Sequence, residues 1–141
     1  MKKFLLITIA FIGVSFYSKA QCDSTIKWNC NKLKITDASG NVLVEKDERS
    51  TVVVDKKSVV ITPEDANGEM TGTVSAFDCN WQQLGKEGKT VVKADITDGS
   101  GNVRHATITI EAAKGKTTIT LVAAEEQTTI TLDVADYAVV K

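Results

Sequence analysis

The 141-residue sequence has few of the side chains on which catalysis and metal binding usually depend. It holds a single His, His105, which excludes sites built on two imidazoles, and its three cysteines form no Cys-x-x-Cys pair. We therefore expect no catalytic residues, no bound metal and no cofactor, and a protein that is not an enzyme.

Clustered basic charge is also lacking. The chain carries 17 Lys and Arg against 18 Asp and Glu. Nucleic-acid binding depends on grouped Lys and Arg side chains that neutralise phosphates, so nucleic acid is not an expected partner. After residue 20 no apolar run approaches the roughly 20 residues that a membrane-spanning helix needs, so no membrane span is expected.

Residues 1–20 have the pattern of a secretory signal peptide. Lys2 and Lys3 precede an apolar stretch over residues 4–14, and small residues stand at 18 and 20. We predict cleavage after Ala20, a secreted or periplasmic location and one domain over residues 21–141. Lipid attachment at Cys22 is disfavoured, because Gln21 stands where a lipoprotein signal has a small residue.

Export to an oxidising compartment permits a disulfide. The segment Trp28-Asn29-Cys30 is mirrored by Cys79-Asn80-Trp81, which suits two strands that pack a Trp beside a bridge. We predict a bond between Cys30 and Cys79, with Cys22 left over near the N-terminus. Spacing does not determine connectivity, so Cys22 to Cys30 and Cys22 to Cys79 remain open.

Proline is almost absent, whereas Thr, Val and Ile recur in short alternating runs that are typical of strands. These runs predict an all-β fold, an antiparallel meander of about ten short strands in a closed or nearly closed barrel. A two-sheet β-sandwich is the alternative, because alternation reports one buried face and not closure. The runs cover residues 33–36, 42–46, 51–55, 58–62, 71–77, 89–97, 103–112, 117–123, 128–134 and 137–140.

The turns between the runs are predicted from their residues. Segments 37–41, 65–69 and 98–102 each place a Gly three positions after an Asp, which favours a four-residue hairpin loop. A calcium loop is disfavoured, because each segment lacks the further carboxylates that such a site needs. Two-residue turns at 114–115, 125–126 and 56–57 sort the flanking strands into an apolar face and a polar face. They predict the pairs Ile110–Ile119, Ile108–Leu121, Thr109–Thr120, Leu121–Ile130, Ile119–Leu132, Thr120–Thr131 and Val54–Val59.

Three aromatic residues are candidates for a binding site. Trp28, Phe77 and Trp81 suit either an ordinary core or the mouth of an apolar pocket. The segment 78–88 is the longest without alternation and is the expected place for a lid or binding loop. We therefore expect a non-enzymatic binding module for a small apolar ligand.

The second candidate site is an array of threonines on the polar face. It comprises Thr107, Thr109, Thr118, Thr120, Thr129 and Thr131. Such a face, or an edge strand, favours the alternative function of a cell-surface interaction protein that contacts glycan, ice or another envelope protein. The simpler interpretation is that Thr suits an exposed strand.

His105 has acidic residues within reach. A four-residue hairpin at 98–102 places Asp95 opposite Arg104, beside His105. Because neither a nucleophile nor a second carboxylate stands at a meaningful spacing, we predict an exposed strand residue beside an Asp–Arg ion pair.

Overall fold

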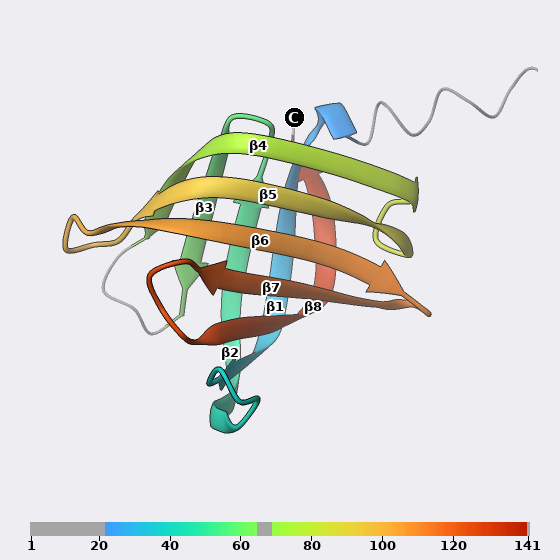
Figure 1. The fold of residues 1–141 in the computed structure, drawn as a ribbon. Helices are drawn as coiled ribbons and strands as arrows, with labels where there is room; N and C mark the ends of the chain where they lie inside the picture. The colour runs from blue at the N-terminus through green and yellow to red at the C-terminus, as the bar shows by residue number, and fades with distance from the viewer. Residues whose placement is uncertain (1–21, 65–68, 141) are drawn as a thin grey trace, which may run out of the picture.

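Eight antiparallel strands close into one barrel in sequence order in the computed structural model, which describes residues 22–64 and 69–140 (Figure 1). Each strand pairs with the next, and β8 pairs with β1 to complete the wall. The predicted all-β meander and closed barrel are confirmed. The strands are β1 (Thr25–Thr36), β2 (Val42–Val54), β3 (Ser58–Pro63), β4 (Met70–Gln83), β5 (Glu87–Thr97), β6 (Val103–Ala113), β7 (Lys116–Ala123) and β8 (Thr129–Val140).

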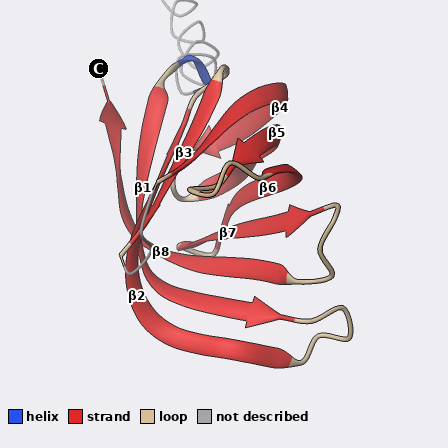
Figure 2. Cartoon of the chain, turned by 90° about the vertical axis from the view of Figure 1, so that its left-hand side faces the viewer, coloured by secondary structure: helices blue, strands red, loops and turns tan. Residues whose placement is uncertain are grey.

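The barrel has eight strands where about ten are predicted, because two strands run through breaks in the apolar alternation. β2 joins runs 42–46 and 51–55 across the charged segment 47–49, and β8 joins runs 128–134 and 137–140. The pairing of β1 shifts register against both neighbours near Cys30. Such bulges bend a strand without ending it, and β1 and β2 curve strongly along their length (Figure 2).

The predicted register is confirmed for all three strand pairs, but the predicted two-residue turn at 125–126 is wrong, because residues 124–128 connect β7 to β8. The β6–β7, β7–β8 and β2–β3 ladders contain each of the seven predicted pairs, from Ile110–Ile119 to Val54–Val59. Lys114 and Gly115 have φ angles of 55° and 77°. Positive φ at both central residues is the signature of the two-residue hairpin turn whose twist matches that of the flanking strands.

The Asp-containing loops 37–41 and 98–102 have the same internal hydrogen bonds. In the second loop the Asp98 carboxylate accepts the main-chain N–H of Ser100 at 2.9 Å and of Asn102 at 3.0 Å. These hydrogen bonds, the one from Asn102 foremost, lower the pKa of Asp98, and the equivalent bonds lower the pKa of Asp37. The predicted loop at 65–69 falls on residues 65–68, which lie outside the described part.

The interior of the barrel is filled by inward-facing aliphatic and aromatic side chains. The largest side chains with essentially no exposure are Trp28, Ile108, Ile110, Ile119, Val52, Val59 and Val92. An eight-stranded barrel is just wide enough for its own side chains or for one small ligand. In this barrel the protein's own side chains fill most of the interior. The remaining space lies at one end of the barrel.

Candidate functional sites

A small cavity lies where the predicted aromatic residues meet. Trp28 reaches it from β1, and Phe77 and Trp81 reach it from β4. Its volume is about 10 Å³, which is room for about one water molecule. The residues that line it are Ser24, Ile26, Trp28, Val54, Phe77, Cys79, Trp81, Leu84, Thr90 and Ile110.

The two tryptophans that line this cavity also contact each other. Their rings stack with centroids 5.9 Å apart, and Trp28 also contacts the ring of Tyr137 at 5.3 Å. The indole N–H of Trp81 donates a hydrogen bond of 2.6 Å to the buried Thr90 hydroxyl. The site is therefore apolar with a few oriented polar groups, which is the usual composition of a small-molecule pocket.

The wall of the barrel is incomplete beside this cavity. β3 pairs with β4 only between Met70 and Thr73, whereas β5 accompanies β4 as far as Gln83. Beyond Val74, whose N–H donates to the Lys57 carbonyl at 3.0 Å, no described strand lies on that side of β4. The outer half of β4 is therefore an open edge of the sheet.

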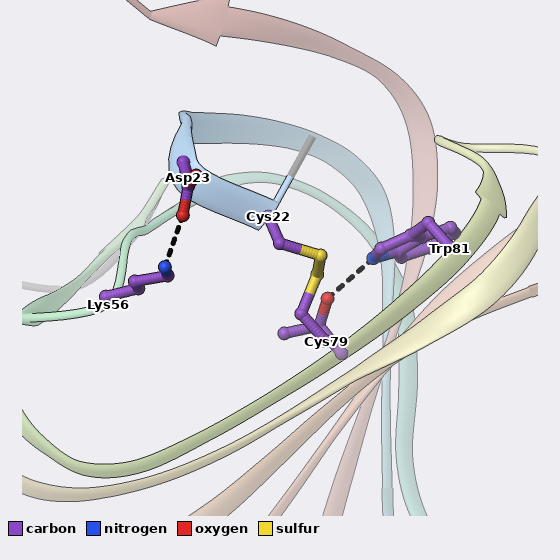
Figure 3. Close-up of a disulfide and its surroundings, with 6 residues drawn as sticks. Cys22, Asp23, Lys56, Cys79 and Trp81 are labelled. Atoms are coloured by element: carbon purple, nitrogen blue, oxygen red, sulfur yellow. Dashed lines mark hydrogen bonds and ion pairs between the residues drawn. A yellow bond between two sulfur atoms is a disulfide. The ribbon is translucent and has the colours of Figure 1, made fainter. Parts of the chain in front are cut away.

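A short turn at the N-terminus of the described chain covers this open edge. Cys22 forms a disulfide with Cys79 of β4, and Asp23 forms an ion pair with Lys56 in the turn between β2 and β3 (Figure 3). The next residue, Ser24, lines the cavity. We call residues 22–24 the N-terminal strap, because they join the two sides of the opening.

The observed disulfide corrects the prediction of a Cys30–Cys79 bond. The mirrored motifs do bring Trp28 and Trp81 together, but β1 and β4 are not neighbours in the sheet and cross at a steep angle (Figure 1). Cys30 and Cys79, which each lie two residues from a tryptophan, therefore do not meet. Cys79 instead bonds to Cys22, which is one of the pairings that spacing left open.

The spare thiol is consequently Cys30 and not Cys22. Cys30 is buried inside the barrel opposite Ser50 of β2. Burial raises the pKa of its thiol to about 11, against a smaller lowering by the hydrogen bond with Ser50. Since the thiolate is the reactive form, both the burial and the raised pKa disfavour reaction at Cys30.

The segment 78–88 is not the lid that its lack of alternation predicts. Most of it belongs to β4 and β5, and the turn between them packs against the end of the barrel. The Leu84 carbonyl accepts a 3.0 Å hydrogen bond from the Tyr137 hydroxyl, and the Gly85 carbonyl accepts one of 3.2 Å from Thr117. Neither Leu84, which lines the cavity, nor Tyr137, which contacts Trp28, is predicted as a site residue. Leu84 belongs to the segment expected as a lid or binding loop, and Tyr137 belongs to a predicted strand.

Three of the six threonines in the array lie directly opposite one another across three strands, and the other three lie beside this row. Thr109, Thr120 and Thr131 lie opposite one another across β6, β7 and β8, as predicted. The other pairs are offset. Thr107 and Thr129 each face Val122, and Thr118 lies between Glu111 and Asp133. All six threonines are half-buried, and the uncharged surface is therefore a narrow stripe bordered by carboxylates.

His105 pairs with Asp95, and the predicted Asp95–Arg104 pair is wrong by one residue. The loop over Asp98–Asn102 closes with five residues, which sets Asp95 opposite His105. The ring Nδ1 lies 2.5 Å from the Asp95 carboxylate, and this hydrogen bond, with the negative charges of Asp95 and Glu125, raises the pKa of His105. Arg104 forms an ion pair with Glu126 instead. The histidine is exposed and is not among the residues that line the aromatic cavity.

Within residues 22–64 and 69–140, no three His, Cys, Asp or Glu side chains converge as metal ligands. The same part of the chain has no helix long and apolar enough to cross a membrane.

Comparison with known proteins finds no matching family model, no matching curated protein and no matching solved structure. The geometry of the chain is therefore the basis for any functional conclusion.

Proposed function

We propose that this protein is an exported, non-enzymatic binding module that takes a small apolar ligand at the cavity lined by Trp28, Phe77 and Trp81. The observation that carries this proposal is their convergence from two opposite walls on one cavity beside the open edge of β4. Elsewhere in the described barrel, Ile and Val side chains fill the interior. The indole-bonded hydroxyl of Thr90 gives the site a fixed polar group beside the aromatic surface.

Export is part of the proposal. The predicted signal peptide over residues 1–20, with cleavage after Ala20, lies outside the described residues. The Cys22–Cys79 disulfide is compatible with an oxidising secreted or periplasmic compartment. Lipid attachment at Cys22 requires the same sulfur that the disulfide uses, which further disfavours a lipoprotein.

The size of the cavity sets a condition on binding. About 10 Å³ does not hold an apolar molecule, so a ligand enters only when a lining segment moves away. The lining residues Ser24 and Leu84 lie outside every strand, so the strap and the turn between β4 and β5 are the lining segments best placed to move.

Native mass spectrometry of protein purified without denaturation tests the proposal directly. We expect a mass above that of the disulfide-bonded chain, lost after organic extraction. A titration with the amphipathic fluorophore 1-anilinonaphthalene-8-sulfonate, whose aromatic rings bind apolar sites, supplies a second readout. Phe77→Trp fills the cavity and should abolish saturable binding, whereas Val122→Trp enlarges an outer side chain and should leave it unchanged. A bare chain that binds no fluorophore would exclude the apolar-ligand function.

A second candidate function rests on the direct row of Thr109, Thr120 and Thr131. Three aligned hydroxyls form a short hydroxyl-rich row between charged residues, and a glycan is the partner of that chemistry. Thr120→Lys places a charge in the middle of the row, and Thr71→Lys places the same charge on the exposed part of β4. In co-sedimentation with insoluble cellulose, chitin and peptidoglycan, the native protein and Thr71→Lys should pellet with the glycan, whereas Thr120→Lys should stay in the supernatant. Retention of both variants, or of neither the variants nor the native protein, would remove this candidate.

A further inference from the structure

The last half of β8 is an open edge of the barrel wall. β7 pairs with β8 only over residues 129–133, whereas β1 accompanies β8 as far as Val140. Residues 134–140 therefore pair on the β1 side alone, and in Figure 2 no described strand lies on the other side of this end of β8, which leads to the C mark. A free edge presents unpaired main-chain N–H and C=O groups to which a further strand can bind.

This edge is apolar and exposed. Every residue over 135–140 is exposed, and Tyr137, Val139 and Val140 have 40 %, 50 % and 44 % of their surface accessible. The stretch 134–140 has one charged side chain, that of Asp136, which accepts a hydrogen bond from Asn29. Exposed apolar side chains on an unpaired strand are the features of a surface where another chain pairs.

Two other strands have long stretches that pair on one side, and both are protected. β2 lacks a partner on its β3 side over residues 42–49, and residues 45–49 are all charged. β4 lacks one on its β3 side over residues 75–83, where it has a bulge next to Val74 and the strap bonded to Cys79. Charges, bulges and covering segments keep sheet edges from pairing. Over residues 136–140, β8 has no bulge and a single charge, so this edge is the least protected of the three.

The side chains of this stretch alternate between the two faces of the wall. Tyr137 and Val139 lie opposite the buried Trp28 and Ile26 of β1, so they are on the inner face. The hydroxyl of Tyr137 donates to the Leu84 carbonyl, which fixes the ring in place. The alternate residues 136, 138 and 140 are on the outer face.

Residues 136–140 are complementary to a second copy of themselves. An antiparallel pair centred on Ala138 sets Tyr137 opposite the partner's Val139, and Asp136 opposite the partner's Val140. Each pair joins residues of the same face, as antiparallel pairing requires, and no two charges meet. The inner pair joins an aromatic to a β-branched side chain, a combination that stabilises neighbouring strands. A patch that pairs with itself in this way is the interface of a two-fold dimer.

We propose that this protein forms a two-fold dimer through the open edge of β8, with residues 136–140 of the two copies paired antiparallel about Ala138. This inference goes beyond the ligand function and does not depend on it. Stable complexes bury roughly 1,200–2,000 Å² in total, and five residues a side form a smaller interface. We therefore expect a dimer that dissociates on dilution.

The residue on the two-fold axis gives the most direct test. Ala138 faces its own copy, and Cα atoms in such a pair are about 4.5–5.5 Å apart, which a disulfide can span. We expect Ala138→Cys to form a covalent dimer under mild oxidation, measured by non-reducing electrophoresis. Lys27→Cys is the matched control, because Lys27 is exposed beside Ala138 on β1 but lies away from the axis, and it should stay monomeric. A monomeric Ala138→Cys, or equal cross-linking of both variants, would overturn the interface.

Charges at the ends of the paired stretch test its register. Val140→Lys sets a positive charge opposite the partner's Asp136 and should lower the dissociation constant about tenfold, whereas Val140→Glu should raise it about tenfold, since each pair occurs twice in the dimer. The Asp136→Lys/Val140→Glu double variant restores opposite charges and should recover the dimer. Val103→Lys places the same charge on an exposed valine of β6 and should change nothing.

Sedimentation equilibrium of the native protein and these variants, at concentrations up to about 1 mM, supplies the dissociation constants. A native protein that is monomeric throughout this range would overturn the dimer. Association that continues beyond two copies would show that β8 pairs with a different edge of the next copy, which overturns the two-fold arrangement. Shifts of the same sign for Val140→Lys and Val140→Glu would overturn the register about Ala138.

Discussion

The substitution Gly85→Ala tests the packing that closes the end of the barrel beside the cavity. Gly85 lies in the turn between β4 and β5 with φ at +74°, a conformation that side chains disfavour. A Cβ built there lies 2.2 Å from Cε1 of Tyr137. The ring cannot yield freely, because its hydroxyl donates to the Leu84 carbonyl and the ring contacts Trp28 in a tilted arrangement.

The cost of this substitution follows from three contributions. The left-handed backbone costs about 1–2 kcal/mol for a residue with a Cβ, offset by about 0.5–1 kcal/mol because Ala has less freedom than Gly in the unfolded chain. Displacing Tyr137 loses a hydrogen bond of about 0.5–1.5 kcal/mol and an aromatic contact of about 0.5–1.5 kcal/mol. We therefore expect the free energy of unfolding to fall by about 2–4 kcal/mol.

Urea unfolding followed by tryptophan fluorescence measures this loss, since Trp28 contacts the displaced ring. Gly101→Ala is the matched control. Its φ is +83°, but nothing lies within 4 Å of the added Cβ, so it should lose only the backbone contribution of about 0.5–1 kcal/mol. In the Gly85→Ala/Tyr137→Ala double variant the clash is absent, and the loss should fall well short of additive. Equal losses for Gly85→Ala and Gly101→Ala would refute the contact with Tyr137.

Three smaller predictions concern the turns and the surface. Lys114→Gly relieves a positive φ of 55° at the β6–β7 turn and should raise the free energy of unfolding by about 0.5–1 kcal/mol; an unchanged urea midpoint would contradict this. The pKa of Asp98 is lowered by its loop hydrogen bonds, so its stabilisation is present above pH 3.8 and disappears as the pH falls through the folded-state pKa. Asp98→Asn should flatten this acid limb of the stability curve, and an identical limb would contradict the assignment. The pKa of His105 is raised above 6.5, so its stabilisation is complete below that pH and disappears as the pH rises through the folded-state pKa. His105→Gln should remove this dependence, and an NMR titration of the imidazole at or below pH 6.5 would refute the pairing with Asp95.

Pairings between consecutive strands are the part of the fold that the sequence predicts well. The turn at Lys114-Gly115 and the alternation of Ile and Thr on either side determine one register, and the barrel has it. The predicted strand bounds and pairings are wrong where the main chain bulges, continues or gains a loop residue without a change in the apolar pattern of the sequence. The shift near Cys30, the continuous β2 and the extra residue in the 98–102 loop each depend on main-chain geometry that many side chains tolerate.

Contacts across the interior depend on closure, which periodicity does not encode. Alternation identifies the side chains that face inward, but the curvature of the wall decides which of them meet. Trp28 and Trp81 meet because their rings are long enough to span the interior between crossing strands. The short side chains of Cys30 and Cys79 require neighbouring main chains, which the crossing of β1 and β4 does not provide. Cys79 therefore bonds with Cys22, a residue outside every strand. Because strand patterns carry no information on such a residue, they do not predict the strap that this bond holds.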